Sequence, residues 1–309
     1  MNNVSRRRFL KHGAMTTASV ALMTALPEQL LAKSLAKSAG IQLYTVGDPL
    51  VKDMDGTLAK LAAMGYRTVE SAGMAGKSAA DFRKSLDAAG LKCPSSHLFP
   101  TPGQSNEQFL DNAKTLGSEY VVSSVMIKLD ASIKSVDDYV KVMAALTQDD
   151  FKRMAGDLNA LATKAKSTGL KFAYHNHNME FRKWSDGSTT YEILMAGTDP
   201  SLVKIELDCG WADLGGQSPL ELFKKYSGRF RMLHVKDFVA VPHPLTELDL
   251  HAMPESTELG KGHMDYRTIL AAAPVAGVEY IFVEQEPPFV HFTAFDAAKV
   301  DYDYLQSIG

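Results

Sequence analysis

Side chains that bind metals or move protons stand at the ends of several short apolar runs. They are Glu70, His97, His175, His177, Asp208, His234, Lys236, Glu284 and Glu286. Imidazoles and carboxylates that converge on one place repel each other or go unsatisfied without a cation or a hydrogen-bonded network. A mixed nitrogen and oxygen set suits manganese, cobalt, iron or zinc better than magnesium or calcium. The pattern predicts a divalent metal site. The alternative is a metal-free site in which Lys236 and arginines neutralise the carboxylates.

Such side chains meet only if the strand ends that carry them meet. From Gly40 onward, short β-branched or apolar runs alternate with longer helical patterns, which is typical of βα units around a parallel sheet. Strands are expected over 41–46, 66–71, 92–97, 120–125, 171–175, 203–208, 230–235 and 280–284. Helices are expected between them, for example over 58–64, 79–89, 106–116, 151–167 and 219–226.

Eight strands predict an α/β fold, a (β/α)8 TIM barrel that forms a single domain over residues 40–309. In such barrels the chemistry lies where the strands end, which is where the polar side chains stand. An open doubly wound sheet is the alternative architecture. No Gly-x-Gly-x-x-Gly follows the first expected strand, so a nucleotide site has no support.

Composition limits the classes of partner. The 309 residues are 45% hydrophobic and 22% charged, which is ordinary for a globular chain. A formal net charge of -3 gives no general attraction to nucleic acid or anionic lipid. Two cysteines, Cys93 and Cys209, make no disulfide framework. We expect a small-molecule sugar substrate and no nucleic acid partner, and a homo-oligomer remains open because the exposed faces of the outer helices decide it.

The N-terminus has the composition of an export signal. Arg6 and Arg7 precede Phe9 and Leu10, and an uncharged stretch follows over residues 13–26. This resembles a bacterial twin-arginine signal. The stretch is too short and too rich in Ala, Ser and Thr for a stable membrane anchor. A basic amphipathic helix is the alternative interpretation.

The expected consequence is a periplasmic or otherwise exported protein. Residues 1–39 are then a signal peptide and linker that the twin-arginine export machinery recognises, with cleavage after Ala32 or Ala36. Substrates of that pathway are exported folded, so a weakly binding ion can be loaded in the cytoplasm before zinc or copper competes. Manganese is therefore the favoured ion.

Five motifs together resemble one family. They are Tyr174-His-Asn-His-Asn-Met-Glu-Phe181, Glu206-Leu-Asp208-x-x-Trp211, Leu233-His-Val-Lys-Asp237, Glu258-Leu-Gly260-x-Gly262-x-x-Asp265 and Phe282-Val-Glu-Gln-Glu286. In this order they resemble the sugar phosphate isomerase/epimerase family of xylose isomerase-like TIM barrels. The resemblance implies a divalent ion held by Asp208, His234, Glu284 and a ligand from the 171–175 strand. Many relatives read Glu-Asn-His there, so the fourth ligand becomes His175, with Glu180 as the nearest carboxylate.

The resemblance also implies a reaction. It indicates an isomerase or epimerase that removes a proton next to the carbonyl of an unphosphorylated sugar or keto-sugar. The candidate catalytic residues are Glu180, Glu284, His177 and Lys236, and the candidate substrate-binding residues are Gln42, Glu70, His97 and Trp211. Relatives that epimerise use two ion-bound glutamates, of which only Glu284 remains here. The alternatives are a metal-dependent lyase or dehydratase of 3-keto-glycosides or inosose-like ketones, and a non-catalytic sugar-binding barrel.

Overall fold

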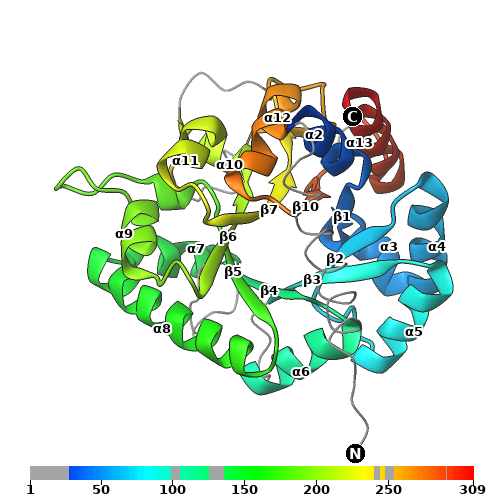
Figure 1. Ribbon diagram of the computed structural model, residues 1–309, viewed down its shortest axis with the longest axis horizontal. Coiled ribbons are helices and arrows are strands. Elements are labelled where there is room, and N and C mark those ends of the chain that lie inside the picture. The colour runs from blue at the N-terminus through cyan, green and yellow to red at the C-terminus, as the bar shows by residue number, and fades with distance from the viewer. Residues whose placement is uncertain (1–27, 99–104, 125–135, 240–243, 248–253, 290) are drawn as a thin grey trace, which may run out of the picture.

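A closed ring of parallel strands forms the centre of the molecule (Figure 1). The computed structural model describes residues 28–98, 105–124, 136–239, 244–247, 254–289 and 291–309. The ring order is β1-β10-β7-β6-β5-β4-β3-β2. The strands are β1 (Gly40–Gln42), β2 (Thr68–Ala72), β3 (Lys92–Leu98), β4 (Tyr120–Ser123), β5 (Lys171–His175), β6 (Val203–Asp208), β7 (Phe230–Val235) and β10 (Tyr280–Val283). The predicted eight-stranded barrel is confirmed.

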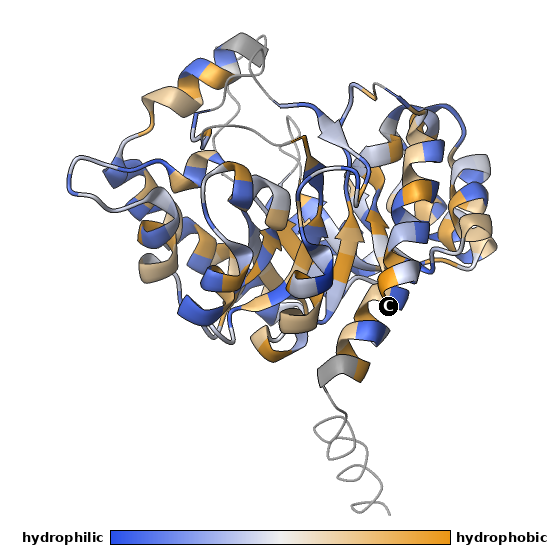
Figure 2. Cartoon of the chain, turned by 90° about the horizontal axis from the view of Figure 1, so that it is seen from above, coloured by the Kyte–Doolittle hydropathy of each residue, from blue (hydrophilic) through white to orange (hydrophobic). Residues whose placement is uncertain are grey.

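Helices surround this ring and bury their apolar faces against it (Figures 1 and 2). They are α2 (Glu28–Lys37), α3 (Gly47–Lys52), α4 (Met54–Met64), α5 (Ala79–Ala89), α6 (Asn106–Leu116), α7 (Val136–Ala145), α8 (Gln148–Ser167), α9 (Thr190–Gly197), α10 (Cys209–Leu214), α11 (Pro219–Lys225), α12 (Tyr266–Ala276) and α13 (Ala294–Ile308). Helices α5 and α6 have the predicted bounds. Each ends at a glycine with positive φ, Gly90 at 69° and Gly117 at 80°, a conformation that costs glycine little.

The first strand is shorter than predicted. It ends at Gln42, and Leu43–Val46 forms a 3-10 turn, η1. The Gln42 side chain accepts a hydrogen bond from the Tyr44 backbone N–H at 3.1 Å, which caps this turn. A small two-stranded sheet that was not predicted follows β7. In it, β8 (Asp237–Phe238) pairs antiparallel with β9 (Ser256–Thr257). Two-residue strands of this kind leave no periodic signal in a sequence.

Helix α2 occupies residues that the sequence analysis placed in the linker. Its Leu35 and Ala36 are buried in the main hydrophobic core, and the helix packs against α12 and α13. The Gln306 amide donates to the Lys37 carbonyl oxygen at 3.3 Å. The folded unit therefore includes Glu28–Lys37. The paired arginines lie outside the described residues, and none of the described helices is long and apolar enough to cross a membrane.

An apolar layer fills the middle of the barrel. Tyr120, Val122, Ala173, Met232 and Phe282 form a buried cluster inside the ring. Because successive side chains of a strand alternate between faces, the residues two positions further along β5 and β7 also point inward. They are His175 and His234, so the apolar layer forms the floor of the polar end of the barrel.

Candidate functional site

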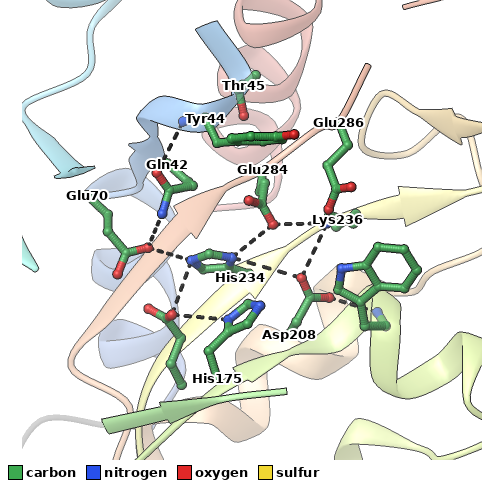
Figure 3. A network of polar contacts seen from close by, with 12 residues as sticks. Gln42, Tyr44, Thr45, Glu70, His175, Asp208, His234, Lys236, Glu284 and Glu286 are labelled. Atoms are coloured by element: carbon green, nitrogen blue, oxygen red, sulfur yellow. Dashed lines mark hydrogen bonds and ion pairs between the residues drawn. The ribbon is translucent and has the colours of Figure 1, made fainter. Parts of the chain in front are cut away.

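Four predicted ligands meet at the C-terminal ends of the strands (Figure 3). His175, Asp208, His234 and Glu284 each offer a ligand atom, and these atoms lie within 4.8 Å of one another. They come from β5, β6, β7 and the residue after β10, and all four are buried. Glu180 belongs to none of the described groups that could hold an ion. The geometry therefore favours His175 over Glu180 as the contribution of β5.

His234 lies between carboxylates on both sides of its ring. Its Nδ1 is 3.0 Å from Glu284 Oε2, and its Nε2 is 2.6 Å from Glu70 Oε2 and 3.3 Å from Glu206 Oε2. Burial opposes protonation, but Glu206, Glu284 and Glu70 raise the His234 pKa well above its ordinary value. Such a ring is stable as an imidazolium, or as a neutral ring that donates from Nε2 and ligates a cation through Nδ1.

His175 is held by the same carboxylate as His234. Its Nδ1 lies 3.1 Å from Glu206 Oε2. Burial and the neighbouring His234 lower the His175 pKa well below its ordinary value, so its imidazole is neutral, as a metal ligand must be. With Nδ1 turned to Glu206, Nε2 is the nitrogen left for an ion. Glu206 thus orients both imidazoles through one oxygen.

Glu206 is not among the site residues predicted from the sequence. It stands two residues before Asp208 on β6, and this spacing puts both side chains on the inner face of the barrel. That spacing was the available signal. Its partners lie on β5 and β7, so its function became visible only once the strands were neighbours.

One oxygen of Asp208 is left without a hydrogen bond. Oδ1 accepts from the Trp211 backbone N–H at 2.7 Å and caps α10. Oδ2 is buried and has no hydrogen-bond partner among the described residues, with Lys236 Nζ 3.6 Å away. Burial raises the Asp208 pKa to about 6, against the opposing effect of Lys236. A buried carboxylate oxygen of this kind fits a cation ligand, and two imidazoles with two carboxylates fit a divalent transition ion.

Lys236 lies among the carboxylates at the C-terminal ends of the barrel strands. Its Nζ lies 2.9 Å from Glu284 Oε2, pairs with Glu286, and sits 4.6 Å from the centre of the Trp211 ring. Burial would lower its pKa, but Glu284 and Glu286 raise it, so the amine is charged. Within the described chain no arginine pairs with these carboxylates. Carboxylates outnumber the side-chain cations here, which favours a metal ion over a metal-free mouth.

Lys236 pairs with Glu284 and Glu286 and not with Asp237, its neighbour in the sequence. Among the described residues, Asp237 accepts hydrogen bonds from backbone N–H groups of the loop that follows β9. The donors are Gly260, Gly262, His263 and Met264. The side chains of Lys236 and Asp237 point to opposite sides of the backbone because successive side chains alternate along an extended chain. Asp237 therefore shapes a loop, and Lys236 belongs to the site.

Gln42 and Glu70 lie beside the cluster, where Glu70 contacts His234. Gln42 Nε2 donates to Glu70 Oε2 at 2.7 Å, and Ser95 Oγ donates to Glu70 Oε1 at 2.6 Å. Gln42 is 1% exposed and Glu70 0%. Their predicted role was to bind substrate hydroxyls. Their side-chain atoms are instead committed to the network that holds His234.

His97, His177 and Trp211 line the mouth beside His175. Ring centres lie 5.1 Å apart for His97 and His175, 5.0 Å for His175 and His177, and 5.8 Å for His177 and Trp211. Burial and Lys236 lower the His177 pKa to about 3, so this imidazole is neutral. In the described structure, His177 Nδ1 and Trp211 Nε1 are buried without a hydrogen-bond partner. These atoms can bind a substrate.

Glu180 is engaged elsewhere. Its Oε1 accepts from the Tyr174 hydroxyl at 2.7 Å and its Oε2 accepts from the His177 backbone N–H at 3.1 Å. The residue is fully buried, and burial raises its pKa to about 7. This geometry gives Glu180 the role of fixing the loop that carries His177, which differs from the catalytic role predicted for it.

The comparisons with known proteins agree with this architecture. An inosose dehydratase from Lacticaseibacillus casei is 30% identical over 170 residues, which cover 52% of this chain and 55% of that protein. The chain thus matches about half the length of this curated relative. The crystal structure of a sugar phosphate isomerase/epimerase from Parabacteroides distasonis is 25% identical with a TM-score of 0.68, over 87% of this chain and 96% of that one.

A third likeness concerns the fold alone. A xylose isomerase-like TIM barrel protein from Mycobacterium smegmatis, solved in complex with magnesium, is 14% identical with a TM-score of 0.61, over 88% of this chain and 96% of that one.

The family model described as xylose isomerase-like TIM barrel matches residues 58–291. With a closed barrel of the right strand order, this match shows that the chain belongs to the xylose isomerase-like TIM barrel family.

Proposed function

We propose that this chain is a divalent-metal-dependent dehydratase, a lyase of inosose-like ketones or keto-sugars. It removes a proton from the carbon next to a carbonyl and expels the hydroxyl on the following carbon as water. The inosose dehydratase relatives support this elimination over the isomerisation or epimerisation that the sequence analysis put first. The observation that carries the proposal is the buried group His175, Asp208, His234 and Glu284 with Lys236 against it.

The side chains that the proposal uses, His177 and Lys236, both lie against Trp211. When bound, a divalent ion supplies a Lewis acid that polarises the substrate carbonyl. His177 is neutral and has a free Nδ1 in the described structure, so it can accept the proton from the carbon. Lys236 Nζ can donate a hydrogen bond to the oxygen on which negative charge develops. The His177 imidazolium can then deliver the proton to the leaving hydroxyl, which departs as water while a carbon–carbon double bond forms.

Elimination is also the reaction that needs fewer groups. Epimerisation through an enediolate needs a base on each face of the substrate, and Glu180, the other candidate glutamate, is held by Tyr174 and the loop backbone. A syn elimination needs one group that accepts a proton and returns it. His177 can do both. The absence of Glu180 from the cluster therefore supports the one-sided reaction.

We also propose the ion and the location. Manganese is the favoured ion if the protein folds in the cytoplasm and is exported through the twin-arginine pathway, because the ion is then chosen before zinc or copper competes. The paired arginines at residues 6 and 7 support export. An exported enzyme meets unphosphorylated sugars, so the proposed substrate carries no phosphate.

The mass of the product tests the reaction. The protein is incubated with manganese and an inosose, and the products are identified by mass spectrometry. The proposal expects a product lighter by one water from the inosose, lost in His177→Gln and kept in the control His291→Gln, whose ring is exposed on the surface. A product of unchanged mass would support isomerisation or epimerisation instead. Binding without any product would support the sugar-binding barrel.

A further inference from the structure

A cavity lies at the opposite end of the barrel from the candidate metal centre, which is the group His175, Asp208, His234 and Glu284. It has a volume of about 350 Å³ and is lined from the N-terminal ends of β4, β5, β6 and β7 and from α8. Lys204 lines it two residues before Glu206 and four before Asp208 on the same strand. The volume is in the range of small-molecule sites. None of the residues that form the metal centre lines this cavity.

The polar lining of this cavity is mostly cationic. Lys166, Lys171, Lys204 and Arg231 line it, with Glu279 as the acidic residue. Glu279 is already engaged, because Arg231 Nε lies 3.3 Å from its Oε1 and the Tyr120 hydroxyl donates to its Oε2 at 3.0 Å.

Lys171 has an acidic partner of its own. Its Nζ lies 3.4 Å from Glu119 Oε2, outside the cavity lining, and 3.9 Å from Glu279. Glu279 and Glu119 are thus paired with Arg231 and Lys171, whereas Asp199, which acts electrostatically on Lys166 and Lys204, accepts a hydrogen bond from the Ser201 backbone N–H at 2.7 Å.

Lys166 and Lys204 remain without an ion pair in the part of the chain that the structure describes. Lys204 Nζ donates to the Pro200 carbonyl oxygen at 2.7 Å. Burial and then the Arg231 and Arg229 guanidiniums lower the Lys204 pKa, and these effects exceed those of Asp199 and Glu279. Lys204 is thus a half-buried amine beside two guanidiniums, and an anion in the cavity would stabilise its charge.

The rest of the lining is apolar. Ala162, Leu170, Phe172 and Leu202 face the same cavity. A lone inorganic anion would leave these apolar side chains exposed to water, whereas a ligand with an apolar part attached to its anionic group would bury them. The combination of unpaired amines with an apolar wall points to an amphiphilic ligand.

We propose that this cavity binds a small organic oxyanion, its phosphate or carboxylate head between Lys166 and Lys204 and its apolar body against Phe172 and Leu202. The site is separate from the metal centre and does not depend on the reaction catalysed there. Lysine amines suit such a head because they act as point charges that donate several hydrogen bonds.

Calorimetric titration of the full chain with phenyl phosphate tests the proposal. We expect saturable binding that weakens about tenfold or more in Lys166→Met/Lys204→Met, a loss of about 1.4 kcal/mol. The control Lys152→Met/Lys224→Met removes the same charge from two exposed lysines that have acidic partners, and it should bind as the parent does. Benzyl alcohol, which keeps the ring and lacks the anion, should not bind, and inorganic phosphate should bind more weakly.

Two further variants locate the binding. Lys166→Arg/Lys204→Arg keeps the charge and should retain binding, which separates a lost anion contact from a damaged fold. Asp208→Ala/His234→Ala should also retain it, because those residues lie at the other end of β6 and β7. Equal binding in parent and Lys166→Met/Lys204→Met, loss of binding in Asp208→Ala/His234→Ala, or no saturable binding of phenyl phosphate would each overturn the proposal.

Discussion

At the scale of single residues, Glu206 has the most consequential position outside the ligand group. One of its oxygens lies within 3.3 Å of both His175 Nδ1 and His234 Nε2. A carboxylate that accepts from an imidazole fixes the tautomer and aims the other nitrogen at the ion. Glu206 does this for two candidate ligands at once, so its acceptor oxygen is expected to matter for metal affinity although Glu206 is not one of the four candidate ligands.

Replacing Glu206 by Gln is therefore expected to weaken metal binding while one ion per chain still binds at saturation. The expected loss is about 10-fold to 100-fold in affinity, which is typical for removing such a partner. Competition titration with a chelating dye measures it. Glu221→Gln is the control, because Glu221 is 70% exposed on α11. Unchanged affinity in Glu206→Gln would show that the imidazoles need no help from this carboxylate.

Glu180 gives a prediction about pH and stability. Burial raises its pKa from the ordinary 4.5 to about 7 in the folded protein. Between these two values the folded state holds a proton that the unfolded state has released, so the free energy of unfolding falls as pH rises and levels off above pH 7. The full effect is at most about 3 kcal/mol.

Urea unfolding of the metal-free protein at several pH values tests this. Glu180→Gln should remove the Glu180 part of the slope, so the difference between parent and variant should grow in favour of the variant as pH rises from 4.5 to 7. Buried groups that do not interact with Glu180 titrate in both proteins and cancel in the comparison. A constant difference across this range would mean that Glu180 is ionised throughout.

At the scale of elements, α2 gives the first prediction. Its Leu35 and Ala36 are buried, and its last carbonyl accepts from Gln306. A chain that begins at Ser38 should have a free energy of unfolding about 2 to 4 kcal/mol lower than one that begins at Glu28, because an apolar contact area is exposed on α12 and α13. Urea unfolding of the two chains compares them. Equal stability would mean that α2 does not contribute to the fold.

The loop after β9 gives the second element-scale prediction. A Cβ at Gly262 would collide with Asp237 Oδ1 and the Phe238 carbonyl oxygen. Gly262→Ala should therefore cost about 1 to 3 kcal/mol and disturb the segment next to Lys236. Gly156→Ala is the control, since Gly156 lies within α8 and a Cβ there meets nothing within 4 Å; alanine should stabilise that helix slightly. Thermal unfolding distinguishes the two, and equal melting temperatures would contradict this account of the loop.

How much could be predicted differs between elements for physical reasons. Strands β5, β6 and β7 have the predicted bounds, because buried parallel strands read as continuous apolar runs ended by polar residues. Helix α2 was missed because it closely follows the signal-like stretch of residues 13–26, and everything up to residue 39 was assigned to the signal peptide and linker. The turn η1 depends on a side-chain cap at Gln42, which periodicity does not report.

The sequence predicted which side chains meet at the mouth of the barrel, and it did not predict the hydrogen-bonded network that joins them. His234 contacts Glu70 across 164 positions of sequence, and that contact requires the closed ring and its register. The contacts of Glu206 and Glu286 depend on the same closure. Composition and spacing indicate which residues do chemistry; the topology decides which of them are ligands and which orient ligands.

At the scale of the whole molecule, the barrel has two chemically different ends. The C-terminal end holds carboxylates and imidazoles that fit a cation, and the N-terminal end holds lysines that fit an anion. The apolar layer of Val122, Ala173, Met232 and Phe282 separates them. The central claim is that the first of these ends holds one divalent ion on which the reaction depends.

Metal content tests that claim most directly. Mass spectrometry of protein purified without chelators and reloaded with manganese should find one ion per chain in the parent and none in Asp208→Ala/His234→Ala. The control Asp213→Ala/His263→Ala removes the same residue types from a hydrogen-bonded pair outside the cluster and should keep its ion. Equal metal content in the parent and Asp208→Ala/His234→Ala, or no metal in any of the three, would contradict the account.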